Sequence, residues 1–190
     1  MAESKNALRR SMRVLRDQIN EELLEQSSQK ITEEVLGLPQ ILTAKVIFVY
    51  ISFRSEVQTH ALIDQLLERD KQVCVPFIDE SDRMQAVRFD GWHNMELNPF
   101  GFLVPREAVS ENRTIELSIV PGLGFTREGL RLGYGKGHYD RFFSARAGGT
   151  KVGLAFDCQI VDQIPSEPFD CPMDYVLTES QMHSNGTQIS

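Results

Sequence analysis

The chain has 190 residues, of which 41% are hydrophobic and 25% charged, and its formal net charge is −7. This length suits one domain with a sizeable core, and the acidic balance disfavours nucleic acids and membrane surfaces as partners. The longest strongly apolar run, residues 46–51, is too short to span a bilayer, and residues 1–18 lack the hydrophobic stretch of a secretory signal.

The N-terminal residues predict two helices. Apolar residues from Leu8 to Ile19 recur at helical spacing and indicate a helix over residues 5–19. A second helix is expected over residues 21–36, where Gly37 and Pro39 end it. Basic residues follow another face of the first helix, at Lys5, Arg9, Arg13 and Arg16. Because like charges at this spacing repel, the stripe indicates either a solvated basic face or a site for an anion.

Residues 45–77 predict a strand, a loop, a helix and a second strand. The run over 45–52 is rich in β-branched and aromatic residues, as in a buried strand. Thr59 is expected to cap a helix that ends near Arg69, before a strand over 73–77. This order predicts one α/β domain with an open, mostly parallel sheet and helices on both faces, in three layers. Ligands bind such sheets beyond the carboxyl ends of the strands, which places residues 52–56 on the binding rim.

Residues 84–105 predict a further strand followed by an irregular segment. The strand is expected over 84–89, whereas Pro99 and Gly101 interrupt residues 92–105. This segment carries Trp92, Phe100 and Phe102. These aromatic side chains either form the floor of a pocket for a flat ring or pack beneath a loop.

The stretch after Ile119-Val120 is the strongest functional signal. It runs Pro-Gly-Leu-Gly-Phe-Thr-Arg-Glu-Gly-Leu-Arg-Leu-Gly-Tyr-Gly-Lys-Gly over residues 121–137, and a helix is expected over 138–146. Glycines at 133, 135 and 137 can turn several N–H groups toward one point, and Arg131 and Lys136 add positive charge. A strand, a glycine loop and a helix N-terminus in this order favour phosphate binding. The spacing fits neither the P-loop nor the dinucleotide fingerprint, and a tight turn that only saves space is the alternative.

Two aspartates are candidate metal ligands. Asp140 lies on the first turn of the helix after the glycine loop, and Mg²⁺ prefers carboxylates together with phosphate oxygens. Asp174 precedes a strand expected over 175–178, and from the residues alone a cap or a surface charge is the better interpretation of it. A strand over 151–156 and a helical turn over 159–164 come before it. Residues 181–190 are polar and are expected to form a frayed tail beyond a domain that spans residues 1–180.

Several blocks of the sequence match motifs of a known family. They are Val-Pro-Gly-Leu-Gly-Phe (120–125), Arg-Leu-Gly-Tyr-Gly-Lys-Gly-His-Tyr-Asp-Arg-Phe (131–142), Val-Gly-Leu-Ala-Phe-Asp (152–157) and Pro-Met-Asp-Tyr-Val-Leu-Thr-Glu (172–179). Two shorter patterns are Lys5-x-x-Leu8-Arg9 and Tyr50-x-Ser52-x-x-x-Glu56-Val57-x-Thr59. Together they strongly resemble the 5-formyltetrahydrofolate cyclo-ligase family, also called methenyltetrahydrofolate synthetase, over nearly the whole chain.

The resemblance implies an enzyme that converts 5-formyltetrahydrofolate and ATP to 5,10-methenyltetrahydrofolate, ADP and phosphate with Mg²⁺. It implies catalytic roles for Lys136, Arg131 and Tyr139. It implies ATP binding by Lys5, Arg9, Arg131, Leu132, Gly133, Tyr134, Gly135, Lys136, Gly137, His138 and Tyr139. The folate substrate is expected to contact Ile51, Glu56, Tyr134, Gly135, Lys136, Gly137 and His138, and Glu56 is expected to accept hydrogen bonds from the pterin. Asp140 and Asp174 are implied as ligands of Mg²⁺.

The chain departs from the pattern of the resembled family at three positions. His138 stands where many relatives have another aromatic residue, Val104 replaces an acid or amide before Pro105, and Phe169 replaces a frequent histidine. These last two departures are expected to change ligand contacts on their loops and to leave the ATP site unaffected.

Two other functions fit parts of the pattern. A binding protein for folate or nucleotide would keep the glycine loop without turning either ligand over, and a sugar-phosphate isomerase or acyl-CoA transferase would need a carboxylate at the rim but no ATP. The three cysteines form no C-x-x-C motif, which favours reduced thiols and a cytoplasmic protein. We expect a monomer or weak dimer whose partners are small molecules, namely ATP and the folate, with no nucleic acid and no membrane.

Overall fold

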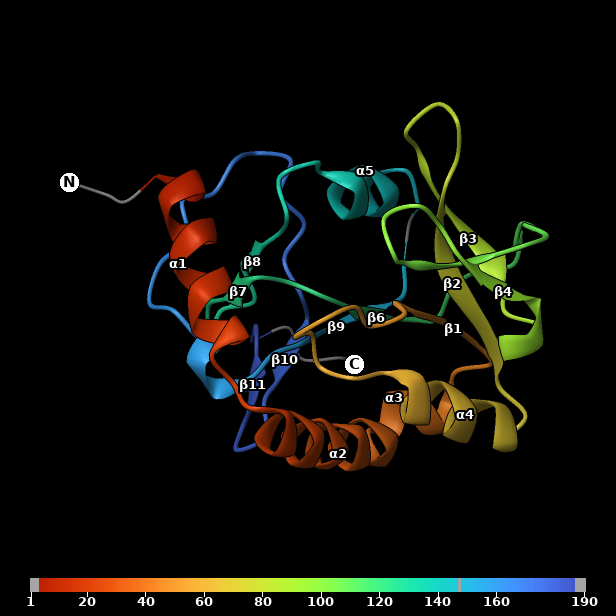
Figure 1. Cartoon of the computed structure of the whole chain (residues 1–190), viewed down its shortest axis with the longest axis horizontal. Coiled ribbons are helices and arrows are strands. Elements are labelled where there is room, and N and C mark those ends of the chain that lie inside the picture. The colour runs from red at the N-terminus through yellow and green to blue at the C-terminus, as the bar shows by residue number, and fades with distance from the viewer. Residues whose placement is uncertain (1–3, 147, 187–190) are drawn as a thin grey trace.

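The core of the protein is a seven-stranded sheet. The computed structural model describes residues 4–146 and 148–186, and within them the strand order is β11-β10-β9-β6-β1-β2-β3 (Figure 1). The strands are β1 (Val46–Val49), β2 (Gln72–Ile78), β3 (Met84–Arg88), β6 (Leu117–Val120), β9 (Thr150–Leu154), β10 (Tyr175–Leu177) and β11 (Met182–Ser184). The five central strands are parallel, whereas β3 and β11 pair antiparallel at the two edges. The mostly parallel sheet expected from the sequence is confirmed.

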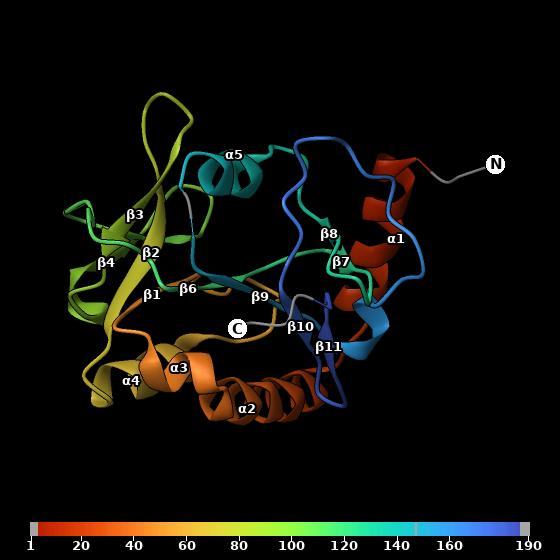
Figure 2. The same ribbon diagram turned by 180° about the vertical axis from the view of Figure 1, so that it is seen from behind.

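Helices cover both faces of this sheet, as Figures 1 and 2 show from opposite sides. One face carries α2 (Glu21–Gly37), α3 (Pro39–Thr43) and α4 (His60–Glu68), and the other carries α5 (His138–Ser144). Successive side chains of a strand point to opposite faces, so Ile47 packs with α2 and α4 whereas Phe48 stacks on Phe142 of α5, with ring centroids 4.9 Å apart. The three-layer arrangement is therefore confirmed. Among the described helices, none has the length and apolar character needed to cross a bilayer.

The first helix, α1 (Lys5–Asp17), lies beside the sheet rather than on a face of it (Figure 1). It packs on η2 (Asp157–Gln159) and on a small hairpin made of β7 (Gly124–Phe125) and β8 (Arg131–Leu132). Leu8 and Met12 are buried there against Leu123 and Leu132. Burial of this apolar side leaves part of the basic side of α1 facing the segment that follows β8.

The irregular segment after β3 contains secondary structure that the sequence pattern did not predict. It begins with η1 (Trp92–Asn94) and continues into an antiparallel pair, β4 (Met95–Leu97) and β5 (Leu103–Pro105). Asn98 holds the turn between them, because its side chain accepts hydrogen bonds from the N–H groups of Phe100 and Phe102, both at 3.0 Å. Val104, one of the departures noted above, lies in β5.

Three expectations about local structure are corrected. The tail expected over residues 181–190 contains β11, whose His183 pairs with Val176 of β10. Residues 187–190 of this expected tail lie outside the described residues. Thr59 does not cap α4 with its side chain, because its hydroxyl donates to the carbonyl of Tyr50 (2.7 Å) and accepts from the N–H of Ser52 (3.0 Å). Helix α1 ends two residues before the expected Ile19.

Candidate functional site

Two cavities flank the glycine loop, residues 133–137. The loop cavity, about 350 Å³, is lined by Lys5, Arg9, every residue from Arg131 to Arg141, and the segment around Asp170. The strand cavity, about 440 Å³, lies beyond the carboxyl end of β1 and is lined by Tyr50, Ile51, Phe53, Glu56 and Phe102 among others. Tyr134 and Tyr139 line both cavities. One segment of chain therefore forms a wall common to both.

The conformation of the loop depends on two of its glycines. Gly135 has a φ of 105° and Gly137 a φ of 66°, values in the left-handed region that favours glycine. At Gly133 a Cβ would lie 2.8 Å from Nη1 of Arg131, so a larger residue there would displace this buried guanidinium. The β7–β8 hairpin, which the sequence analysis did not predict, separates β6 from the loop and turns the chain back toward α1.

Positive charge from α1 and from the segment around the glycine loop meets in the loop cavity. The ammonium of Lys5 contacts carboxylate oxygens of Asp170 (2.8 Å) and Glu167 (3.1 Å), and Nε of Arg9 donates to the carbonyl of Gly133 (2.9 Å). Burial alone would lower the pKa of Lys5, but these two carboxylates more than offset it, so the pKa is raised and the side chain is a cation at neutral pH. Nζ of Lys136 makes no hydrogen bond or ion pair with any described residue.

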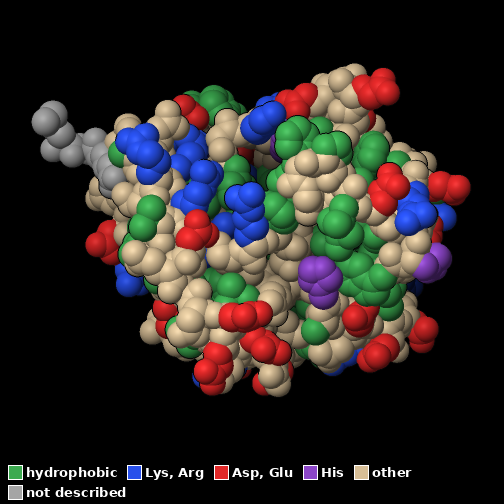
Figure 3. Space-filling model, in the orientation of Figure 1, with side chains coloured by type: hydrophobic (Ala, Val, Ile, Leu, Met, Phe, Trp, Pro, Cys, Tyr) green, Lys and Arg blue, Asp and Glu red, His purple; other side chains and the backbone are tan. Residues whose placement is uncertain are grey.

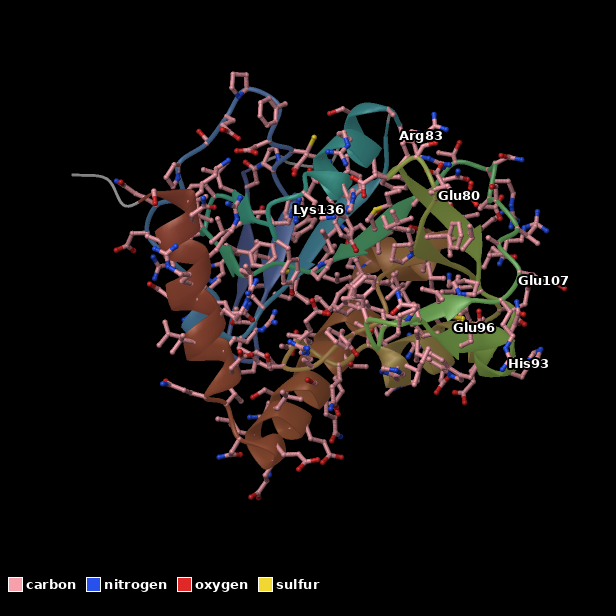
Figure 4. The ribbon with its side chains drawn as sticks, turned by 45° about the horizontal axis from the view of Figure 1, so that its top comes forward. Glu80, Arg83, His93, Glu96, Glu107 and Lys136 are labelled. Carbon is pink, nitrogen blue, oxygen red and sulfur yellow. The ribbon has the colours of Figure 1, made fainter. Side chains whose placement is uncertain are left out.

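These cationic side chains form a visible surface feature. Figure 3 shows Lys and Arg side chains gathered over the α1 side of the molecule, beside a hollow in the surface. Figure 4 labels Lys136 on the stretch between β8 and α5, and Asp82 of the β2–β3 turn contacts His138, two residues after Lys136. The free ammonium of Lys136 thus lies next to the cavity that Lys5 and Arg9 line from the other side.

Arg131 and Asp140 form the floor of the loop cavity. Nη2 of Arg131 donates to Oδ2 of Asp140 (3.0 Å), and the guanidinium lies over the ring of Tyr139, 5.1 Å from its centroid. The Arg131 side chain is almost completely buried, and its Nε is a buried donor with no partner among the described residues. Oδ1 of Asp140 accepts the N–H of Cys171 (3.2 Å). A buried donor without a partner is costly, which suits a site that receives an anion.

The two predicted metal ligands do not meet in the loop cavity. Asp140 lines the cavity, whereas Asp174 is not among the residues that line it. Oδ2 of Asp174 accepts the backbone N–H of Lys151 (2.7 Å) and lies 3.3 Å from the Lys151 ammonium. In this structure Asp174 therefore ties the start of β10 to β9.

Glu56 is the acidic group of the strand cavity and is 9% exposed. Its Oε2 accepts the N–H of Phe53 (2.9 Å), its Oε1 accepts the hydroxyl of Tyr134, and Nη1 of Arg16 lies 4.0 Å from Oε1. Burial raises the pKa of Glu56, while the hydrogen bonds and Arg16 act in the opposite direction. Ile51 lines the same cavity. A buried carboxylate beside apolar walls suits a flat ligand that carries N–H donors at one end.

The aromatic residues of segment 92–105 divide between the two interpretations given above. Phe102 lines the strand cavity and packs on Phe53, with ring centroids 4.2 Å apart. Trp92 instead stacks on His60 outside the cavity, with centroids 4.8 Å apart, and Phe100 is 77% exposed. The pocket interpretation therefore applies to Phe102 alone.

Some residues of the site were not predicted as such. Arg16, placed on the basic stripe, is buried, and it donates to the hydroxyls of Tyr134 (2.8 Å) and Ser55 (3.1 Å). Phe169, a departure expected to leave the ATP site unaffected, instead lines the loop cavity beside Asp170, so that expectation is corrected. His138, which was predicted as a site residue, lines this cavity as expected, and its Nε2 lies 3.0 Å from a carboxylate oxygen of Asp82. The contact of Lys5 in α1 with Glu167 and Asp170 was also not predicted, and the only signal for it in the sequence is the opposite charge of the two segments.

Comparison with known proteins identifies close counterparts of the whole chain. The profile of the 5-formyltetrahydrofolate cyclo-ligase family matches residues 1–179. A probable 5-formyltetrahydrofolate cyclo-ligase of Caenorhabditis elegans is 31% identical, with 94% of each chain covered, and the 5-formyltetrahydrofolate cyclo-ligase of Mus musculus is 32% identical, with 84% of this chain and 85% of the mouse protein covered. The solution structure of Aquifex aeolicus 5,10-methenyltetrahydrofolate synthetase superposes with a TM-score of 0.85 at 28% identity, over 98% of this chain and 95% of that one.

Proposed function

The chain belongs to the 5-formyltetrahydrofolate cyclo-ligase family, and on that premise we propose that it cyclises 5-formyltetrahydrofolate to 5,10-methenyltetrahydrofolate in a reaction that consumes ATP and requires Mg²⁺. The observation that carries the proposal is that the glycine loop borders two cavities, one cationic and one with apolar walls and a buried acid. A reaction that transfers a phosphoryl group between two ligands needs such adjacent sites.

The loop cavity is the proposed site of the ATP phosphates. Lys5, Arg9, Arg131 and Lys136 all line it, and the buried Nε of Arg131 has no partner among the described residues. Loop N–H groups from Leu132 to Tyr139 would add hydrogen bonds to phosphate oxygens, as backbone nests do in other anion sites. Lys136, whose ammonium makes no hydrogen bond or ion pair with the described residues, is the proposed partner of the transferred phosphate.

Asp140 fits the requirements of Mg²⁺ in this cavity. Mg²⁺ binds one or two carboxylates together with phosphate oxygens and water, and Asp140 offers a partly exposed carboxylate beside the proposed phosphate site. Asp174 does not fit in its described position, because it does not line the cavity. Its role as a second ligand stays a prediction. When bound, the ion would neutralise negative charge on the phosphates.

The strand cavity is the proposed site of the folate. Glu56 is the acceptor for pterin N–H groups, and Ile51 and Phe102 would contact the faces of its ring system. Tyr134 and Tyr139 line both cavities, so the formyl group of a bound folate would face the glycine loop. This arrangement would bring the formyl oxygen toward the terminal phosphate near Lys136.

The chemical difficulty of the reaction is that a formamide oxygen is a poor leaving group. In the proposed mechanism this oxygen attacks the γ-phosphorus, and the bond to ADP breaks. The N10 amine then attacks the activated formyl carbon and loses its proton, and phosphate leaves with the former formyl oxygen. Arg131 and Lys136 would stabilise the charge that develops on the transferred group, and Tyr139 would hold the Arg131 guanidinium by cation–π contact. Most of the rate enhancement would come from positioning and charge neutralisation.

The test is an assay of the wild-type protein with 5-formyltetrahydrofolate and Mg-ATP, in which the ultraviolet absorbance of the methenyl product and the release of ADP are followed together. Lys136→Ala and Asp140→Asn should each lower kcat about 100-fold or more, because each removes charge stabilisation from the transferred group. Lys30→Ala, which removes a lysine from α2 on the other side of the sheet, is the matched control.

Three results would contradict the proposal. Near-normal product formation by Lys136→Ala would exclude a role of this ammonium in the reaction. Ligand-induced stabilisation without ADP release would instead indicate a binding protein. Turnover that does not depend on ATP would point to isomerase or transferase chemistry.

A further inference from the structure

The hydroxyl of Tyr134 joins the glycine loop to the acid of the strand cavity. It donates a hydrogen bond to Oε1 of Glu56 and accepts one from Nη1 of Arg16 at 2.8 Å. Burial and the neighbouring Glu56 carboxylate raise the pKa of Tyr134, so the hydroxyl keeps its proton at neutral pH and remains a donor. The loop that lines the proposed phosphate site is thus fastened to the group proposed to bind the pterin.

Tyr134 occupies a position on Glu56 that the substrate needs. The other carboxylate oxygen, Oε2, already accepts the N–H of Phe53 at 2.9 Å. A pterin that donates one N–H group to each oxygen of this carboxylate needs a lone pair of Oε1, the oxygen that the Tyr134 hydroxyl and, at 4.0 Å, Nη1 of Arg16 already face. Because Glu56 is buried, its acceptor positions are few, and the hydroxyl and the substrate compete for them.

In the described loop conformation, two arginines near the proposed phosphate site donate hydrogen bonds to carbonyl groups of the loop. Arg9 donates its Nε to the carbonyl of Gly133 (2.9 Å), and Arg141 donates to the carbonyl of Lys136 (2.6 Å). If Arg9 is to present its Nε donor to a phosphate, it has to release Gly133, the residue directly before Tyr134. Movement of the loop toward a nucleotide and release of Tyr134 from Glu56 are therefore adjacent events on one short segment.

From these contacts, and resting on the proposed function, we infer that Tyr134 is a positioning residue that links the two cavities. Its hydroxyl holds the glycine loop on Glu56 in the free protein, and the pterin displaces it. Displacement frees the loop to close on the nucleotide, so each ligand strengthens the binding of the other. Linkage requires the two effects to be equal in size.

The test measures this coupling by calorimetry. The probes are Mg²⁺ with the β,γ-imido analogue of ATP, which cannot transfer its phosphate, and 5-formyltetrahydrofolate, each titrated into the protein alone and into the complex with the other. The wild-type protein should bind the nucleotide analogue about 10-fold more tightly when the folate is present, a typical size for coupling between sites. Tyr134→Phe, which removes only the hydroxyl, should reduce this factor to about one. The free variant should bind the analogue about as tightly as the wild-type folate complex does.

Tyr139→Phe is the matched control. Tyr139 lines the same two cavities, but its hydroxyl makes no hydrogen bond with the described residues, so this variant should keep the wild-type coupling. Because Tyr134 is 41% exposed and lies in a loop, the phenylalanine variant should fold normally, which its thermal melting curve would verify.

The possible outcomes separate this inference from the proposed function. If the wild-type protein turns over substrate but shows no coupling, or if Tyr134→Phe keeps the coupling, the inference is wrong and the proposed function stands. The inference is equally wrong if Tyr139→Phe abolishes the coupling in the same way. If the wild-type protein binds neither probe, both fail.

Discussion

The ion pairs of Lys5 give a prediction about nucleotide affinity. Its ammonium lies 2.8 Å from Asp170, and the two side chains are only 18% and 16% exposed. A charge-assisted hydrogen bond of this kind contributes about 1.5–3 kcal/mol. If Lys5 binds a phosphate of ATP, the pair with Asp170 has to break first. In Asp170→Asn the ammonium can still donate to the side-chain oxygen, but the attraction between opposite charges at 2.8 Å is lost. This attraction is about 1.5 kcal/mol even with the dielectric constant of water, so the cost of freeing Lys5 falls by about that amount. ATP affinity should then rise about 10-fold.

The assay for this prediction is the KM for ATP at saturating folate, together with the Kd of the nucleotide. The asparagine oxygen can still accept the N–H of Glu167, which Asp170 accepts at 2.8 Å, so the turn should survive the substitution. Asp162→Asn is the control, because it removes the same charge from a side chain that is 93% exposed and pairs with Arg127. An unchanged or raised KM for ATP in Asp170→Asn would refute the idea that these carboxylates compete with phosphate for Lys5.

Three further predictions follow from single contacts. Glu56→Gln should raise the KM for 5-formyltetrahydrofolate about 10- to 100-fold, because a charged acceptor is lost; an unchanged KM would exclude Glu56 as the pterin acceptor. Gly129→Ala should lower the free energy of unfolding in urea by about 2–4 kcal/mol, because Gly129 has a φ of 87° and a Cβ would press on the carbonyl of Met173. The control is Gly37→Ala, where a Cβ meets nothing within 4 Å, so this variant should lose far less stability. Equal losses in the two variants would contradict this reasoning. A hydrogen bond from Arg113 is the chief reason that the pKa of Glu111 is lowered from 4.5 to about 2. Because the folded-state pKa is depressed, the Glu111 carboxylate stabilises the fold fully above pH 4.5 and loses this effect as the pH falls toward 2. Wild type and Glu111→Gln should therefore differ in unfolding free energy at pH 7 and converge near pH 2.

Most of the sheet could be predicted from the sequence because its central strands carry a strong local signal. Residues 46–49 and 117–120 are all buried, and their largely apolar runs are typical of parallel strands covered on both faces. Strand β11 has no such signal. It is short and polar, it lies at an edge, and Met182 is 55% exposed, so only its pairing with β10 defines it as a strand.

The candidate site was predictable where its residues are close in sequence and not where distant segments meet. The run from Arg131 to Asp140 lines one cavity, as a local motif suggests. The burial of Arg16 depends on Tyr134, 118 positions later, and no periodicity within α1 indicates it. Asp174 is a second example of this limit, because its contact with Lys151 follows from the parallel pairing of β9 with β10 rather than from any local pattern.

The position of α1 has a consequence for how the chain reaches its native state. Leu8 and Met12 become buried only against residues that lie more than 100 positions later, and Lys5 meets Asp170 across 165 positions. Closing so long a stretch of chain costs entropy that local structure cannot offset. On refolding, the secondary structure of the central sheet should therefore recover before the cationic cavity is complete, and the return of nucleotide binding should lag behind the return of the far-ultraviolet circular dichroism signal.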